Sequence, residues 1–349
     1  MADNVISLYD TRRMLNVLEQ IPPAPTFLRN TFFRNTIQHD TDTIDIDIVK
    51  GGRRVVPYIR PVQEGVVMER GGFKTNSYKM PYIRVKRISE ADKYFTRSAG
   101  ENPYGNQTPA QRAAKEFIDD LVDLNGNFDA EEERQAAELT FTGRVTIRNE
   151  KGVAFHNIDF EHTNTEVLTG TAKWSDPSQN FNTVLEYLRN KRKSITKTGA
   201  PAPTHIVVAS DVGDVMIKIF NPTNPASYIS SIKAERGQID IQNLPDGVTY
   251  IGYFKELGCD IYSYDGTYTD LDGTVKPYAP AGMISMLSTN ARFDRNYAAI
   301  KNFHANFVSV PRFPHTWIEA DGRGRQVQLE SAPLYALHQV DSVAIAKVL

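Results

Sequence analysis

The chain of 349 residues contains a single cysteine, Cys259. A disulfide within the chain and a cysteine-based zinc cluster are therefore both excluded. No apolar run approaches the ~20 residues of a membrane span. The N-terminal residues MADNVISLYDTRR lack the charged-then-apolar order of a secretory signal. These absences predict a soluble protein that is made in a reducing compartment.

An excess of charge of one sign is also missing. The chain carries 40 Lys and Arg against 42 Asp and Glu, a formal net charge of -2. General affinity for nucleic acid relies on an excess of basic residues, so the totals argue against it. Hydrophobic residues make up 40% of the chain and charged residues 23%, as in a globular protein. The length predicts two or three structural units.

Catalytic and ligand-binding motifs are absent as well. No G-x-S-x-G, G-x-x-x-x-G-K-[ST] or H-E-x-x-H pattern occurs, and the seven histidines show no ligand spacing. Residues 267–273, TYTDLDG, lack the oxygen ligands of a calcium loop and are interpreted as a hairpin loop. We therefore predict that the protein is not an enzyme and has no catalytic, cofactor-binding or metal-binding residues. An α+β hydrolase that uses His205 and Asp211 with a nearby hydroxyl is the alternative from a different class.

The most unusual segment that is present is a long basic ribbon. RPVQEGVVMERGGFKTNSYKMPYIR, residues 60–84, has the pattern of extended strands broken by glycine and lacks a continuous apolar face. It follows a predicted strand in which Ile44, Ile46 and Ile48 alternate with aspartates. Residues 50–97 hold twelve basic and four acidic side chains, a net charge of +8. Because a two-stranded ribbon is marginally stable alone, we expect this one to lie on another surface.

An acidic helix follows the ribbon. Thr108, Pro109 and Gln111 form a capping-box pattern, and apolar residues then recur at helical spacing to about Leu139. Residues 98–143 hold ten acidic and three basic side chains, a net charge of -7. The simpler interpretation is that the basic ribbon and the acidic helix are each solvated separately. Because the ribbon has no core of its own, packing of the ribbon on the helix is favoured instead. Packing within the chain requires a contiguous apolar stripe, whereas in a contact with a neighbouring chain charge sets the register.

The rest of the pattern alternates helices and strands. It predicts a short helix capped by Asp10 that runs through Gln20, a hairpin around residues 150–152, and a compact α+β unit over residues 176–291. That unit opens with a helix at Asp176 and Pro177 that closes in the basic residues 191–193. Further strands are predicted around FHANFVSV (303–310), RQVQLESAPLYAL (325–337) and VAIAKVL (343–349).

The order of these segments resembles the lambda-like phage major capsid protein family, major capsid protein E. The resemblance rests on FLRNTFF, the strand and ribbon after it, and YIRVKR leading to the acidic helix, with LTGTAKWSDPS and QLESAPLYAL further along. It covers nearly the whole chain in the same order. It implies the Hong Kong 97-type phage capsid fold, an α+β fold with an N-terminal arm, an extended β-hairpin loop, a peripheral domain with a long spine helix, and an axial domain.

The resemblance also implies which residues meet a neighbouring subunit, because in this family the extended loop crosses to the peripheral domain of the next copy. It implies an arm at 1–49, the extended loop at 50–97, the peripheral domain at 98–175, the axial domain at 176–291 and a return to the peripheral domain at 292–349. The candidate inter-subunit residues are Arg60, Arg70, Lys74, Lys79 and Arg84 on the ribbon side, and Glu116, Asp120, Asp123, Glu131 and Glu132 on the helix side. The glycines Gly51, Gly52, Gly71 and Gly72 are hinge candidates that let one contact adopt several angles.

The implied function is that of the major capsid protein of a tailed bacteriophage. Such a protein self-assembles as hexamers and pentamers into an icosahedral shell that encloses double-stranded DNA, and it is found in the virion after assembly in the host cytoplasm. The implied partners are scaffold and portal proteins, a decoration protein at the three-fold positions, and DNA held without sequence-specific contact; no membrane and no cofactor is implied. An encapsulin-like nanocompartment shell of the same fold is the alternative. A covalent crosslink from Lys74 or Lys79 to Asn302 or Asn306, with a Glu assisting, is a further option.

Overall fold

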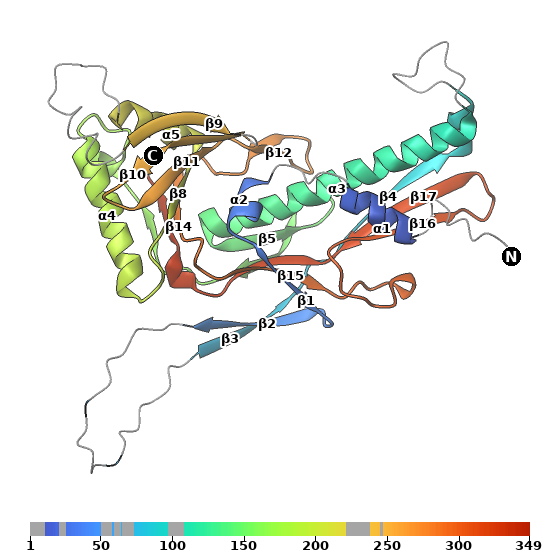
Figure 1. Ribbon diagram of the computed structural model, residues 1–349, viewed down its shortest axis with the longest axis horizontal. Helices are drawn as coiled ribbons and strands as arrows, with labels where there is room; N and C mark the ends of the chain where they lie inside the picture. Colours follow the sequence, from blue (N-terminus) through green and yellow to red (C-terminus); the bar gives the residue numbers. More distant parts are fainter. Residues whose placement is uncertain are drawn as a thin grey trace.

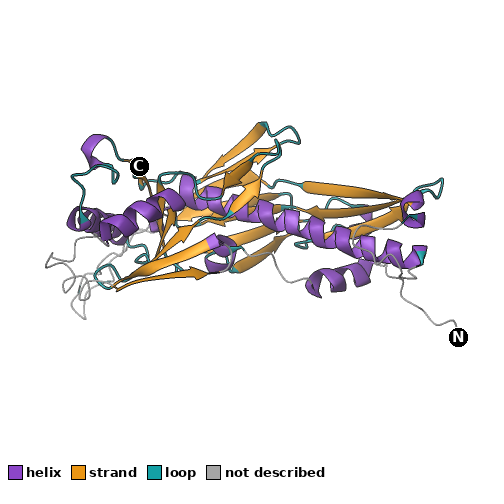
Figure 2. Ribbon diagram, turned by 90° about the horizontal axis from the view of Figure 1, so that it is seen from above, coloured by secondary structure: helices purple, strands orange, loops and turns teal. Residues whose placement is uncertain are grey.

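The computed structural model describes residues 11–20, 26–49, 58, 64, 73–96, 108–220, 238–244 and 247–349. The described body is elongated, and one long helix, α3, runs along it (Figure 1). A large sheet with two helices forms one end, and a smaller sheet lies beside the first half of α3 at the other end. The view turned by 90° shows the same arrangement, with α3 spanning most of the body (Figure 2). None of the helices in these ranges is long and apolar enough to cross a membrane.

Helix α3, Pro109–Thr142, begins and ends at local signals in the sequence. The Thr108 hydroxyl accepts a hydrogen bond from the Gln111 N–H, and the Gln111 side chain accepts one from the Thr108 N–H, so the predicted capping box is confirmed. The helix passes through Asn125 and Gly126 without a break. It ends at Gly143, whose φ of 72° lies in the left-handed region that favours glycine.

The large sheet has seven strands and mixes parallel with antiparallel pairs. Helices α4, Phe181–Lys197, and α5, Ser210–Phe220, pack on it, and Phe181 and Phe220 both contact Phe254. In spatial order the strands are β7 (Thr165–Val167), β19 (Ala344–Lys347), β14 (Met283–Leu287), β8 (His205–Ala209), β11 (Cys259–Tyr264), β10 (Val248–Phe254) and β9 (Gln238–Leu244). Strands β7 and β19 come from outside the predicted axial range 176–291, so this sheet draws on three separate parts of the chain.

The smaller sheet at the other end has three antiparallel strands. They are β16 (Phe313–Ile318), β17 (Gly324–Ser331) and β4 (Ile83–Glu90). Val327 and Leu329 on β17 join a separate apolar cluster with one side of α3 and with Met14 of helix α1, Thr11–Gln20. The predicted N-terminal helix through Gln20 is therefore confirmed, and its apolar side holds it against α3; its predicted cap, Asp10, lies outside the described residues.

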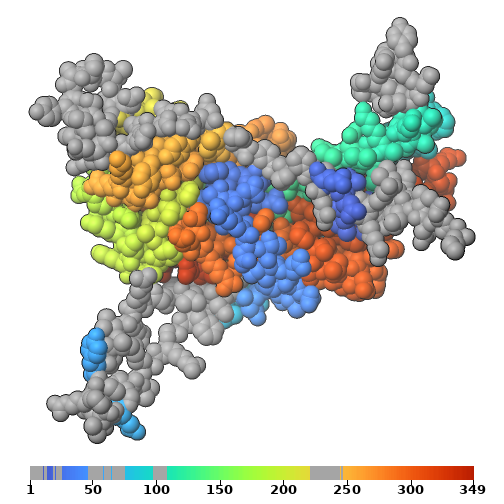
Figure 3. Space-filling model, viewed as in Figure 1, coloured from blue at the N-terminus to red at the C-terminus, as the bar shows by residue number. Residues whose placement is uncertain are grey.

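A third layer joins the two ends. Helix α2, Phe27–Thr31, packs on α3, and strand β1, Asn35–His39, pairs with β15, Phe293–Ala298. The space-filling view shows these blue N-terminal residues lying against the orange C-terminal half (Figure 3).

The remaining elements are β18 (Pro333–Leu337), the hairpins β5–β6 (Arg144–Arg148, Ala154–Asp159) and β12–β13 (Thr267–Thr269, Val275–Pro277), and the 3-10 helices η1 (Ala91–Phe95), η2 (Gly170–Ala172), η4 (Phe303–Ala305) and η5 (Val340–Ser342).

Two predicted elements differ in the structure. The helix expected to open at Asp176 begins at Phe181 instead, because Asp176 accepts hydrogen bonds from Ser178 in a turn while Asn180 caps the helix. The strand expected over residues 303–310 is a 3-10 turn and a loop, because Asn306 and Phe307 have φ values of 50° and 57° and cannot extend a strand. The hairpin around residues 150–152 and the hairpin loop around 270–273 are both confirmed.

Candidate assembly surface

A two-stranded ribbon leaves the body at its lower side (Figure 1). Strand β2, Thr43–Val49, pairs antiparallel with β3, Phe73–Lys79, so that Thr43 lies opposite Lys79 and Val49 opposite Phe73. The base of this ribbon is rooted in the core. Ile44 and Met80 are buried there, and the Tyr78 hydroxyl donates to the backbone oxygen of Asp159. The predicted strand over Ile44, Ile46 and Ile48 is confirmed as the first strand of this ribbon.

The tip of the predicted loop falls almost entirely outside the described residues. Arg60, Arg70, Gly51, Gly52, Gly71 and Gly72 lie there, and Lys74 lies on β3 with its side chain outside the described set. Of the residues between β2 and β3, Tyr58 and Glu64 are described and both are exposed. Lys79 is exposed at the end of β3. The contacts and hinges assigned to this segment stay predictions.

Part of the charge match between ribbon and helix is made within one chain. On β4, Arg87 pairs with Asp120 at 2.8 Å and also with Asp123. Arg84 pairs with Glu330 on the neighbouring strand β17 at 3.3 Å. Since β4 lies beside α3 and pairs with β17, these basic side chains reach acidic partners without a second subunit. Arg84, Asp120 and Asp123 therefore have partners within the subunit, and their role as inter-subunit contacts stays a prediction.

Glu132 is a residue of the subunit interior and not a surface contact as predicted. It has 0% relative exposure, and Arg29 and Arg312 form ion pairs with it. The hydroxyls of Tyr297 and Tyr335 both donate to its carboxylate at 3.1 Å. Burial acts to raise the pKa of Glu132, but Arg312 and Arg29 outweigh it and hold the pKa below its ordinary value. This cluster joins α2, α3, β15 and β18.

The other two helix-side candidates remain at the surface. Glu131 is paired with Arg134 on the same helix at 2.7 Å, and its side chain is 34% exposed. Glu116 is partly exposed and accepts a long hydrogen bond of 3.4 Å from Ser89. Both carboxylates can still reach a neighbouring chain, so their role as inter-subunit contacts stays a prediction.

The sequence reasoning missed an aromatic ladder on the face of the small sheet that points away from α3. Val327 and Leu329 face α3, so the residues that alternate with them on β17 face the opposite way. Their cross-strand neighbours on that face include His315 and Trp317 of β16. His304 stacks on His315 with 4.3 Å between ring centroids, and His315 stacks on Trp317 at 5.4 Å. The rings border a shallow hollow lined by Asn302, His304, His315, Thr316, Trp317 and Gln328. The alternation of ring side chains at residues 313, 315 and 317 is the sequence signal that could have indicated this ladder.

A buried carboxylate fixes the loop beside this ladder. Glu330 has 0% relative exposure and accepts hydrogen bonds from Tyr82, Asn302 and Gln328. Asn302 also caps η4, which leads into a loop whose Phe303 and Phe307 rings are 88% and 53% exposed. Left-handed backbone at Phe307 is unfavourable for a bulky residue and persists only where surrounding contacts impose it. The loop therefore presents apolar surface in one set geometry.

The residues of the hydrolase alternative do not form a catalytic site. His205 Nδ1 lies 2.8 Å from the Thr204 hydroxyl oxygen, and its ring stacks on Tyr262. The Asp211 carboxylate accepts hydrogen bonds from the N–H groups of Val212 and Gly282, which makes it a structural cap. Within the described ranges, no group of three or more His, Cys, Asp or Glu side chains is placed to hold a metal ion.

The long helix α3, the seven-stranded sheet and the projecting ribbon form an α+β subunit whose fold is the Hong Kong 97 type of phage capsid proteins. Residues 10–348 match the sequence model of the family described as phage major capsid protein E, so the chain belongs to that family. The crystal structure of a proposed prophage capsid protein from Escherichia coli CFT073 aligns with a TM-score of 0.70 over 97% of this chain and 99% of its own, at 19% identity.

Curated relatives span the same length as this chain. It is 24% identical to the major capsid protein of Enterobacteria phage P21, over 98% of this chain and 100% of the relative. It is also 24% identical to the major capsid protein of Escherichia phage lambda, over 96% of this chain and 98% of the relative. The predicted resemblance to the lambda-like family is confirmed.

Proposed function

We propose that the chain is the shell subunit of a tailed-phage head and assembles as hexamers and pentamers into an icosahedral container for double-stranded DNA. The observation that carries this proposal is the projecting β2–β3 ribbon, whose buried residues among those described, Ile44 and Met80, lie at its base. A ribbon without a core of its own needs a second surface. Because a ribbon that reaches the next copy makes a head-to-tail contact, repetition of that contact generates rings when the rotation closes.

The surface that receives the ribbon lies at the peripheral end of the neighbouring subunit. The partly exposed carboxylates Glu116 and Glu131 and the partly exposed rings of His315 and Trp317 supply complementary chemistry there. A basic ribbon gains ion pairs from the former and cation–π contacts from the latter, each worth about 0.2 to 1 kcal/mol at exposed sites. Such weak repeated contacts allow errors to dissociate before the shell closes.

Family membership supports the further partners and the place of assembly. A scaffold protein, a portal at one vertex, a decoration protein at the three-fold positions and assembly in the host cytoplasm belong to this proposal. The same membership favours a phage capsid over an encapsulin-like compartment. The two alternatives differ in content, because a phage head holds DNA and a nanocompartment holds protein.

Electron microscopy of the purified full chain under assembly conditions tests the proposal. We expect closed shells or capsomer rings. A matched variant replaces residues 50–72 by Asn-Gly, which joins Val49 to Phe73 as a tight hairpin and keeps β2 paired with β3. This variant is expected to stay folded and to form no shells. A wild-type chain that remains monomeric under every assembly condition, or a loopless variant that assembles normally, would contradict the proposal.

A further inference from the structure

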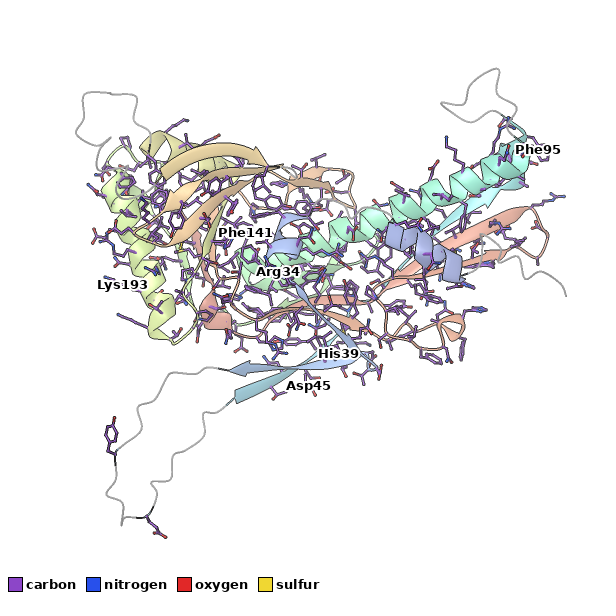
Figure 4. The ribbon with its side chains drawn as sticks, in the orientation of Figure 1. Arg34, His39, Asp45, Phe95, Phe141 and Lys193 are labelled. Carbon is purple, nitrogen blue, oxygen red and sulfur yellow. The ribbon has the colours of Figure 1, made fainter. Side chains whose placement is uncertain are left out.

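Helix α4 gathers basic side chains at the end of the body opposite the small sheet, where Figure 4 labels Lys193. Its second half carries five basic residues, Arg189, Lys191, Arg192, Lys193 and Lys197. Two of them are neutralised by neighbouring acids, since Arg189 pairs with Glu256 and Lys191 with Glu166. Three cations of this helix half, Arg192, Lys193 and Lys197, therefore remain after these two ion pairs.

Two of the three remaining cations lie in a stripe on the solvent side, and the third, Arg192, is half-buried. Asn190, Lys193 and Lys197 are exposed and follow one another at helical spacing along one face. No ion pair joins either lysine to another of the described residues. One acid, Glu186, lies at the N-terminal end of the same stripe. The stripe thus ends in two solvated lysines beside a carboxamide.

The chemistry of this stripe fits a polyanion better than a folded protein surface. Cores of protein interfaces are enriched in aromatic residues and depleted in Lys, and no large exposed hydrophobic residue lies on α4. Phosphate backbones, in contrast, are contacted mainly by Lys, Arg, Asn and hydroxyl side chains. Duplex DNA carries one negative charge per ~1.7 Å, so a duplex lying along α4 meets both lysines in any register.

We propose that Asn190, Lys193 and Lys197 of α4 form a contact site for the phosphate backbone of packaged double-stranded DNA. The inference rests on the proposed function, in which the shell encloses DNA. Because the chain as a whole carries a net charge of -2, the contact is local and weak. It reads no sequence, and it leaves the genome free to slide during packaging and release.

The test compares two double charge reversals of equal size. One is Lys193→Glu with Lys197→Glu on α4; the matched control is Lys115→Glu with Lys151→Glu, at exposed lysines on α3 and at the β5–β6 turn. Binding of the unassembled full chain to a labelled 30-base-pair duplex is measured between 50 and 200 mM salt. We expect the α4 variant to reduce the slope of log affinity against log salt by about 2, roughly one per lysine, and the control to keep the wild-type slope.

The same variants are then assembled with DNA. We expect shells of the α4 variant to form normally and to hold less DNA after nuclease treatment and moderate salt than shells of the control. Equal salt slopes for the two variants would overturn the inference. A polyglutamate peptide that displaces the duplex at equal charge concentration would also overturn it, in favour of an acidic protein partner. Failure of the wild type to form shells would count against the proposed function alone, because the binding measurement needs no shell.

Discussion

His162 sits where the long helix ends, and its surroundings keep its ring uncharged. A Cβ atom at Gly143 would lie 2.5 Å from the His162 Cδ2 atom, so the ring fits directly against the C-terminal cap of α3. Both ring nitrogens are shielded, and no described residue forms a hydrogen bond with them. This burial lowers the pKa of His162 to about 4, although the nearby Asp159 and Asp341 act in the opposite direction.

The lowered pKa of His162 predicts a loss of stability in acid. The unfolded chain binds a proton near pH 6.5, whereas the folded chain does so only near pH 4, so the stabilisation is present above pH 6.5 and is lost as pH falls toward 4. The expected loss is about 2 to 3 kcal/mol. Urea unfolding of the unassembled subunit across this range measures it. His162→Phe should flatten the pH dependence of the free energy of unfolding, whereas His156→Phe on exposed β6 should not. Equal pH dependence in the two variants would contradict the assignment of this effect to His162.

Three successive glutamates show why single-residue roles could not all be predicted. Glu131 pairs with Arg134 three residues away, a spacing that the sequence displays. Glu132 is buried and forms ion pairs with Arg29 and Arg312. Glu133 accepts hydrogen bonds from the N–H groups at the start of α2 and from the Tyr264 hydroxyl. Those partners lie a hundred or more residues away along the chain, so no local pattern separates a buried glutamate from its exposed neighbour.

At the scale of elements, two glycines of the long helix have opposite roles. Gly126 lies in the interior of α3 with nothing within 4 Å of an added Cβ, so Gly126→Ala should stabilise the subunit by about 0.5 to 1 kcal/mol. Gly143 has a φ of 72° and touches His162, so Gly143→Ala should destabilise it by about 1 to 3 kcal/mol. Thermal or urea unfolding of both variants checks the signs. A loss of stability in Gly126→Ala would mean that the helix is not regular there.

Elements with local signals were predicted, and elements set by distant contacts were not. The capping box at Thr108 gave the start of α3, and the alternation around Ile46 gave β2. The loop at residues 303–310 has the composition of a strand, yet Asn302 is fixed by Glu330 and Phe307 takes left-handed backbone. The face of the small sheet that points away from α3 likewise needs β4 and β17, separated by more than 200 residues, to pair.

At the scale of the whole molecule, we expect one group of the basic residues in the ribbon segment to stabilise the subunit and another group to act in assembly. The basic residues on β4 that pair with α3 and β17, Arg84 and Arg87, help to hold one subunit together. Among the candidate contact residues of the ribbon, Arg70 and the Lys74 side chain lie outside the described set, and Lys79 is exposed at the end of β3. Reversing charge in the two groups should therefore have different consequences, one for the stability of the subunit and one for assembly.

Reversal of the ribbon charges tests this division directly. Arg70→Glu, Lys74→Glu and Lys79→Glu together should block shell formation while leaving the urea midpoint of the unassembled subunit unchanged, because the proposed function assigns their partners to another chain. Arg87→Glu should instead lower that midpoint, since it leaves Asp120, which is 9% exposed, without its cation. The matched control reverses three exposed lysines elsewhere, Lys115, Lys151 and Lys255.

Wild-type assembly, followed by light scattering, should weaken as salt rises from 0.1 to about 1 M, where the Debye length falls to roughly 3 Å. Shells that form equally well from the ribbon variant and the control, with no dependence on salt, would show that charge does not position the ribbon.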